Sequence, residues 1–199
     1  RKNGFRRVCE SDLLRYKISL TPMAQAYKDL AFQPVELART PFSQFKSLGA
    51  VAETVDRTKS RFYRGFQTPD GHRLTLFEHD LSADGSSIWR DPADEPERIQ
   101  GKRARLIVLQ AGAGNAISSL SWTEGRRYYE LWMDANVARS PLRQQLFALA
   151  SSLPNSIPGC PNEIPPKPVV IGPDGRPMHE PPPAFLTDTQ MTESDRPCK

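Results

Sequence analysis

The sequence predicts an α+β fold: an antiparallel β-meander packed by a C-terminal amphipathic helix, with short N-terminal helices and a proline-rich C-terminal tail. Three observations predict it. Alternating aromatic and polar runs separated by turn sequences fill residues 61–134. A leucine repeat follows them, and 12 of the 19 prolines lie between Pro154 and Lys199. We therefore expect three parts: 1–60 as an N-terminal helical segment, 61–153 as the sheet with its helix, and 154–199 as an extended tail.

The strands of the meander are predicted from the runs and the turns between them. SRFYRGFQ and HRLTLFEHDL flank TPDG, which is typical of a β-hairpin because Pro, Asp and Gly favour turn conformations. RARLIVLQ and AISSLSW are joined by AGAGN, and TEG leads on to RRYYELWMD. No helix-length pattern separates these last runs, so consecutive strands should pair antiparallel.

The C-terminal helix is predicted from residues typical of a helix start and a helix end. Ser140 is a good N-cap, Pro141 suits the first helical position, and Pro154 ends the run. Between them, leucines recur at helical spacing: Leu142, Leu146, Leu149 and Leu153. This stripe indicates a helix packed on the sheet.

The same cap-then-proline signal predicts two short helices near the N-terminus. Thr21-Pro22 and Thr40-Pro41 mark their starts, and Gly49 is placed to end the second helix after PFSQFKSL.

Charge and hydropathy exclude some classes of protein. The net charge is only +4, and no RNA- or DNA-binding pattern accompanies the basic N-terminal residues, so we expect no nucleic acid partner. No apolar run approaches the roughly 20 residues of a membrane-spanning helix. Because the chain starts at Arg1, a removed signal peptide or membrane anchor stays open as an alternative.

The three cysteines favour a disulfide over a metal site. Cys9, Cys160 and Cys198 lie far apart, with no CxxC and no zinc-ligand spacing. A disulfide among them would pin the tail to the body and would place the protein in an oxidising compartment. Free thiols are the alternative, and no metal or cofactor is expected.

The best catalytic candidate is the run Glu78, His79 and Asp80. A histidine between two carboxylates can act as a general base, but neighbours on a strand point to opposite faces, so the three should not converge. LQAGAGNAISSL lacks the third glycine of a dinucleotide fingerprint, and Gly112 and Gly114 are interpreted as turn residues. We therefore expect no catalytic residues and no cofactor.

The last strand of the meander carries the predicted partner-binding residues. Tyr129, Leu131 and Met133 should share the face under the helix, while Tyr128, Glu130 and Trp132 share the other face, because side chains alternate with a period of two. Arg126 and Arg127 should lie beside the second set at the turn. Such a surface suits a protein partner, and its alternative is a face covered by the N-terminal helices or the tail.

The layout from RFYRGFQTPDGHRLTLFEHDL through RLIVLQAGAGNAISSLSWTEGRRYYELWM to the helix ending LASSLP resembles small bacterial cell-envelope domains. Among these are the immunity proteins that neutralise type VI secretion effectors. The resemblance is architectural and implies a non-catalytic periplasmic protein that inhibits a cognate toxin enzyme by direct binding. Two alternatives stay open: a cell-envelope sensor or small-ligand-binding domain with an apolar pocket between sheet and helix, and an enzyme using Glu78 and His79.

Overall fold

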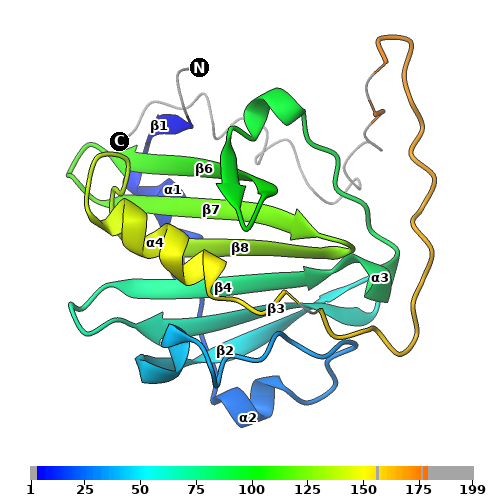
Figure 1. The fold of residues 1–199 in the computed structure, drawn as a ribbon, viewed down its shortest axis with the longest axis horizontal. Helices are drawn as coiled ribbons and strands as arrows, with labels where there is room; N and C mark the ends of the chain where they lie inside the picture. The colour runs from blue at the N-terminus through cyan, green and yellow to red at the C-terminus, as the bar shows by residue number, and fades with distance from the viewer. Residues whose placement is uncertain (1–3, 156, 176, 179–199) are drawn as a thin grey trace. The chain divides into compact units, whose positions relative to one another are not determined.

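A computed structural model of the chain describes residues 4–155, 157–175 and 177–178. The chain forms two compact units, residues 1–166 and 167–199, and the described helices and strands all lie in the first (Figure 1). The strands are β1 (Phe5–Val8), β2 (Lys46–Val55), β3 (Thr58–Gln67), β4 (Arg73–Asp80), β5 (Glu97–Ile99), β6 (Lys102–Ala111), β7 (Ala116–Glu124) and β8 (Arg127–Met133). The α-helices are α1 (Glu10–Leu14), α2 (Met23–Ala26), α3 (Leu81–Asp84) and α4 (Leu142–Ser151), with 3-10 helices at Pro41–Gln44 and Pro92–Asp94.

One mostly antiparallel sheet of eight strands organises the first unit, which confirms the predicted class of fold. The strand order is β1-β6-β7-β8-β4-β3-β2, with β5 also paired to β6. Two antiparallel meanders, β2-β3-β4 and β6-β7-β8, are joined by an antiparallel pairing of β4 with β8. Among the strands of the described residues, only β1 pairs in parallel, with β6. The predicted hairpins around TPDG and AGAGN are both present.

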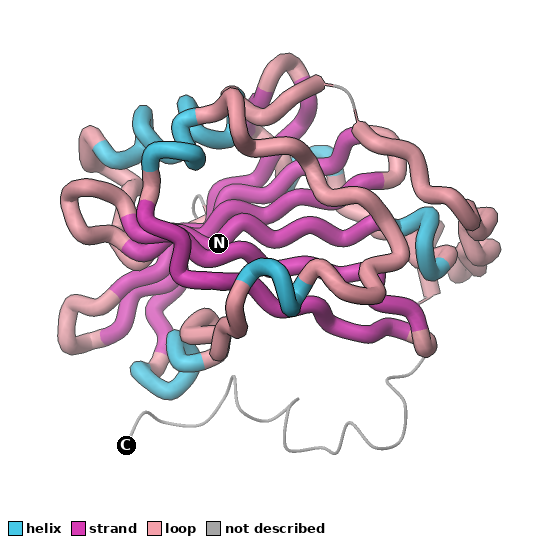
Figure 2. Tube along the Cα trace, turned by 90° about the horizontal axis from the view of Figure 1, so that it is seen from below, coloured by secondary structure: helices cyan, strands magenta, loops and turns pink. Residues whose placement is uncertain are grey.

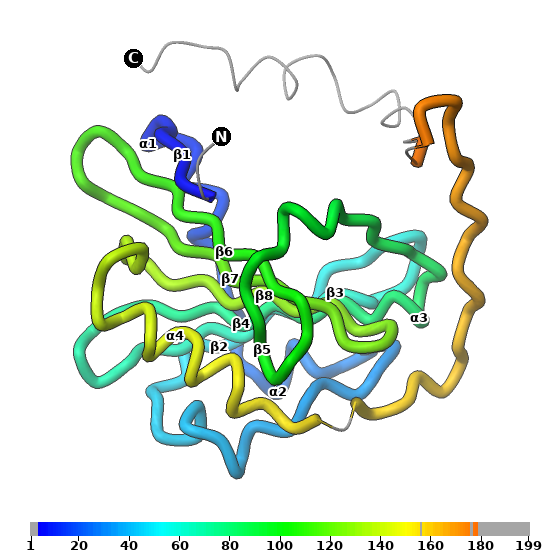
Figure 3. The backbone as a smooth tube through the Cα atoms, turned by 45° about the horizontal axis from the view of Figure 1, so that its top comes forward, coloured from blue at the N-terminus to red at the C-terminus, as the bar shows by residue number. Residues whose placement is uncertain are grey.

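The sheet has two faces, which we call the core face and the open face. The core face carries Tyr129, Leu131 and Met133 of β8, and the open face carries Tyr128, Glu130 and Trp132. In Figure 1, α4 lies in front of the core face, and Figure 3 shows α1 on the opposite side of the sheet from α4. Figure 2 shows the strands as a single layer with helices and loops on both sides.

The core face carries the main apolar cluster of the protein. Leu146, Leu149 and Leu153 are buried in the same cluster as Leu131 and Met133. Leu142 is only partly buried at its edge. N-terminal residues contribute as well, at Val35, Leu37 and Phe42.

The prediction that residues 1–60 form a helical segment is wrong. This part of the chain supplies β1 and β2, one at each end of the strand order, and its helices are short. The segment from α1 to α2 runs between them across the open face. Leu13 of α1 packs there on Leu109 and Ala111 of β6. A strand at the edge of a sheet depends on long-range pairing, which local helix signals do not report.

Gly49 shows why the second N-terminal helix is shorter than predicted. Instead of ending a helix, Gly49 lies in β2 at a register shift, with φ +106°. A Cβ there would come within 2.3 Å of the carbonyl oxygen of Thr21, which accepts the amide hydrogen of Ala50. The glycine therefore permits a bulge that docks the N-terminal segment on the edge strand.

The first part of the predicted extended tail, up to residue 166, falls within the first compact unit. The Ile164 amide donates to the carbonyl of Ser82, and the Pro158 carbonyl accepts a hydrogen bond from Arg127. The part of the predicted tail from residue 179 onward lies outside the described residues.

The cysteines fit the disulfide prediction only in part. Cys160 has a free thiol. No disulfide joins two cysteines within the described residues, and Cys198 lies outside them. The pairing stays a prediction. In the described part of the chain, no helix has the length and apolar composition needed to cross a membrane.

Candidate binding pocket

The three β8 residues predicted to form a partner surface lie together on the open face. Tyr128, Glu130 and Trp132 are each partly exposed, whereas their neighbours on β8 are buried on the core face. The N-terminal segment covers part of the open face and leaves these three side chains accessible. The predicted alternation along β8 is confirmed.

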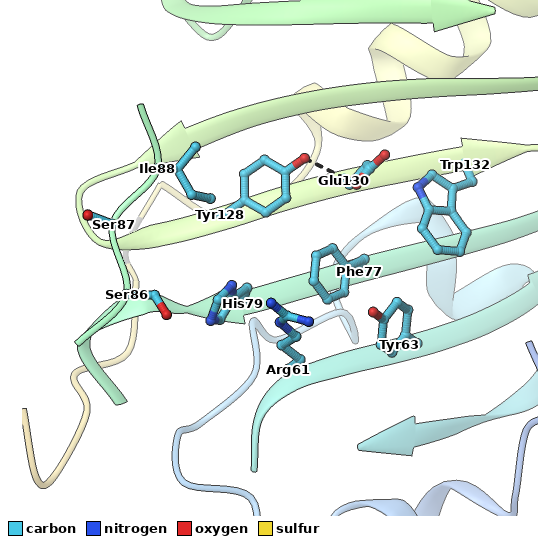
Figure 4. A pocket seen from close by; sticks show the side chains of 10 residues that line it. All are labelled: Arg61, Tyr63, Phe77, His79, Ser86, Ser87, Ile88, Tyr128, Glu130 and Trp132. Atoms are coloured by element: carbon cyan, nitrogen blue, oxygen red, sulfur yellow. Dashed lines mark hydrogen bonds between the residues drawn. The ribbon is translucent and has the colours of Figure 1, made fainter. Parts of the chain in front are cut away.

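A pocket with a volume of about 360 Å³ opens around these side chains (Figure 4). Strands β3, β4 and β8 form its floor and one side, and the loop after α3 forms one end. Its volume falls at the lower end of the range for small ligand sites. The lining residues are Arg61, Tyr63, Phe77, His79, Ser86, Ser87, Ile88, Tyr128, Glu130 and Trp132.

The register of three strands brings the floor residues together from distant parts of the sequence. In an antiparallel pair, residues directly opposite each other point to the same face. Two rows of side chains therefore cross β3, β4 and β8 on the open face: Tyr63, Phe77 and Glu130, and beside them Arg61, His79 and Tyr128.

Four Tyr, Phe and Trp rings line the pocket. Tyr63 stacks on Phe77 with ring centroids 4.5 Å apart, and Phe77 meets Tyr128 edge to face at 5.8 Å. The Trp132 ring lies 5.8 Å from Tyr63. These contacts hold the rings in place, so a ligand would find a rigid surface.

Segments from outside the sheet close the two ends of the pocket. At one end, Tyr16 after α1 packs edge to face on Trp132 at 4.8 Å. Beside it, Leu20 occupies the space that a Cβ on Gly65 would need, at 2.2 Å. At the other end, Arg126 donates hydrogen bonds to the carbonyls of Ser86 and Leu81 and so fixes the loop after α3.

Glu130 is the acidic group of the pocket. Its carboxylate accepts hydrogen bonds from the hydroxyls of Ser119 and Tyr128, the latter at 3.1 Å. Burial, and secondly the charge of Glu130, raise the pKa of Tyr128 well above its usual value, so this phenol stays protonated. Within the described residues, Glu130 forms no ion pair.

Arg61 is the basic group of the pocket, and it has an acidic neighbour. Its guanidinium lies 3.4 Å from the carboxylate of Glu53 on β2, which also accepts the hydroxyl hydrogen of Tyr63 at 2.8 Å. Burial is the largest cause of the raised pKa of Tyr63, followed by its hydrogen bond to Glu53.

His79 lies on the pocket floor and is held by Asp84. Its Nε2 is 2.7 Å from the Asp84 carboxylate, which also accepts a 2.6 Å hydrogen bond from Ser60. Burial lowers the pKa of His79 despite the opposing effect of Asp84. Burial alone would raise the pKa of Asp84. The hydrogen bonds from Ser60, Ser86 and His79 together have the larger effect, so the pKa of Asp84 lies below its usual value. The imidazole is therefore neutral near pH 7.

Glu78 and Asp80 lie on the core face, so the run Glu78, His79 and Asp80 does not converge, as predicted. Glu78 is fully buried between the guanidinium groups of Arg64 and Arg127. Asp80 lies 2.8 Å from the same Arg127. A joint catalytic site of Glu78 and His79 is thus excluded by the geometry of the strand.

The expectation that Arg127 lies beside the partner surface is wrong. Its side chain is 1% exposed and points to the core face. The reason is visible in the sequence: β8 begins at Arg127, so the period of two places it with Tyr129. Arg126 does lie at the turn, where it supports the loop of the pocket rather than lining it.

Several pocket residues were missed by the sequence argument. Arg61, Tyr63 and Phe77 lie in the predicted hairpin, where alternation already groups residues of one strand. The pairing of β4 with β8, which brings this hairpin to Glu130, has no local signal. Asp84, which holds His79, belongs to no sequence motif that would have indicated its role.

His79 should make the protein less stable in mild acid. Because burial holds its pKa below the usual 6.5, the unfolded chain takes up a proton before the folded chain does as the pH falls. We expect the free energy of unfolding to decrease from pH 7.5 to 5.5 in the wild type and to decrease less in His79→Gln, measured by urea denaturation. An identical profile for the wild type and His79→Gln would contradict the prediction.

Among the described residues, no group of three or more His, Cys, Asp or Glu side chains has the geometry to hold a metal ion. No protein family, curated protein or solved structure matches the chain.

Proposed function

We propose that the chain is a non-catalytic extracytoplasmic protein that binds a partner protein through the open face. The observation that carries the proposal is the pocket around Tyr128, Glu130 and Trp132, in which rigid rings surround a carboxylate. Rigid aromatic side chains supply binding energy with little loss of side-chain entropy, and they are enriched among the residues that dominate protein interfaces.

The partner we propose is a secreted toxin enzyme, which places the chain among immunity proteins of the type VI secretion kind in the bacterial periplasm. Direct binding inhibits such an enzyme without any catalysis by the inhibitor. The separation of Glu78 and His79 on opposite faces of β4 supports a non-catalytic role.

A small-ligand-binding domain is the second candidate, because the pocket volume also suits a small molecule. The ligand would sit on the open face. Between the sheet and α4, where this alternative places an apolar pocket, Leu146 and Leu149 pack in the same cluster as Leu131 and Met133.

Replacing Trp132 with alanine should weaken the complex by about 2 kcal/mol, or roughly 30-fold in Kd, because a large ring at the centre of an interface carries much of its energy. The partner would first be identified by copurification from the native organism and mass spectrometry. Calorimetric titration of that partner would then give the affinity.

Tyr27→Ala is the matched control for Trp132→Ala. Tyr27 is a partly exposed aromatic residue that packs on Phe62 of the core face, away from the pocket, so its replacement should leave the affinity unchanged. Unchanged affinity for Trp132→Ala together with a lowered melting temperature would show that Trp132 serves packing, and the proposed surface would be wrong.

A further inference from the structure

The charges of the pocket leave one carboxylate without a cation. Three of the lining residues carry ionisable groups of interest: Arg61, His79 and Glu130. The charge of Arg61 faces Glu53 at 3.4 Å. Arg90, which donates to the hydroxyl of Tyr128 at 2.8 Å, is paired with Glu95 at 3.2 Å. His79 is neutral because it is buried. Glu130 receives only neutral hydroxyl donors, from Ser119 and Tyr128.

A partly buried carboxylate with neutral partners favours a positively charged ligand. An opposite charge close to it in a site of reduced dielectric interacts more strongly than the same pair in water. Each hydroxyl occupies one position on a carboxylate oxygen, and a carboxylate has about four such positions. Glu130 can therefore accept further hydrogen bonds from a cation.

The surrounding rings favour the same ligand. Tyr63, Phe77 and Trp132 line the pocket with Tyr128 (Figure 4), and the face of an aromatic ring attracts a Lys ammonium or an Arg guanidinium. The Tyr128 ring already carries the guanidinium of Arg90, 4.9 Å from its centroid, so the ligand contacts the other rings. The guanidinium is planar, stacks on rings and donates to a carboxylate in pairs. Rings beside a carboxylate thus suit arginine better than lysine.

We infer that the pocket takes an arginine side chain from a surface loop of the partner protein, with Glu130 as its counter-charge. The inference rests on the proposed function, because it names the group that the open face recognises. The guanidinium enters between the rings and donates to the carboxylate of Glu130.

The competing occupant is an acidic group bound by Arg61. The Nε atom of Arg61 is buried and has no hydrogen-bond partner within the described residues. The pairing with Glu53 and the proximity of Glu130 oppose an anion here. An acidic probe therefore belongs in the test.

The probe is the tripeptide Ac-Gly-Arg-Gly-NH2, titrated into the full chain and followed by the indole N–H resonance of Trp132. Trp132→Phe identifies that resonance. Two matched peptides carry citrulline, which has the shape of arginine without its charge, or glutamate. We expect the arginine peptide to shift the resonance saturably and the citrulline peptide to bind at least about tenfold more weakly.

Glu130→Gln keeps the size of the side chain and removes its charge, so it should weaken the arginine peptide about tenfold and leave the citrulline peptide unchanged. Glu124→Gln is the control. Glu124 pairs with Lys102 near the end of β7, and it does not line the pocket, so its replacement should not change either affinity. A thermal melt of each variant reports whether it is folded.

Equal binding of the arginine and citrulline peptides, preference for the glutamate peptide, or no saturable shift with any peptide would each overturn the inference. A failure of this inference can be distinguished from a failure of the proposed function. If Trp132→Ala loses the copurified partner while the arginine peptide fails to bind, the open face is the interface but its occupant is not arginine. If the peptide binds and Trp132→Ala keeps the partner, the pocket accepts a cation and the partner docks elsewhere.

Discussion

Replacing Arg127 with methionine should lower the free energy of unfolding by about 3–5 kcal/mol, because it leaves the buried carboxylate of Asp80 without its cation and leaves Glu78 with Arg64 alone. Arg127 lies 2.9 Å from Glu78 and 2.8 Å from Asp80, and all three side chains are buried. Its guanidinium also donates to the carbonyls of Gln33 and Pro158. The residue thus ties the sheet to two segments that are distant in the sequence.

Urea denaturation at neutral pH measures this loss. Arg39→Met, at an exposed position, is the matched control and should change the stability by no more than about 0.5 kcal/mol. Arg127→Lys keeps the positive charge but not the planar guanidinium, so its free energy of unfolding should lie between those of the wild type and Arg127→Met. A stability of Arg127→Met equal to that of the wild type would show that the carboxylates find other partners.

Replacing Leu146 with alanine should cost about 2–5 kcal/mol, because it removes packing from the middle of the core and leaves a cavity. Leu146 is 0% exposed and belongs to the same cluster as Leu131 and Met133 on the core face. The surrounding strands prevent the cavity from collapsing, so we expect a loss of stability of this size.

The control for Leu146→Ala is Gln144→Ala on the exposed side of α4, where alanine should be neutral or slightly favourable for the helix. Thermal melts of both variants compare the two sides of one helix. A melting temperature of Leu146→Ala equal to that of the wild type would mean that α4 does not stabilise the sheet.

One strand of the candidate site could be predicted from the sequence. Alternation along one strand groups Tyr128, Glu130 and Trp132, since the period of two depends only on the extended backbone. The same rule places Arg127 on the core face once β8 is known to start at that residue. The rest of the pocket comes from β3, β4 and the loop after α3, and no local pattern in the sequence reports that these elements approach β8.

The sequence by itself determined the hairpins, the alternation on each strand and the leucine stripe of α4, because turn chemistry and side-chain periodicity act within a few residues. Only the tertiary structure decided that β4 pairs with β8 and that the N-terminal segment supplies β1 and β2. It also decided that Arg127 joins the two carboxylates of β4. These features depend on contacts between residues far apart in the chain, whose register is set by burial on the whole sheet rather than by any short stretch of sequence.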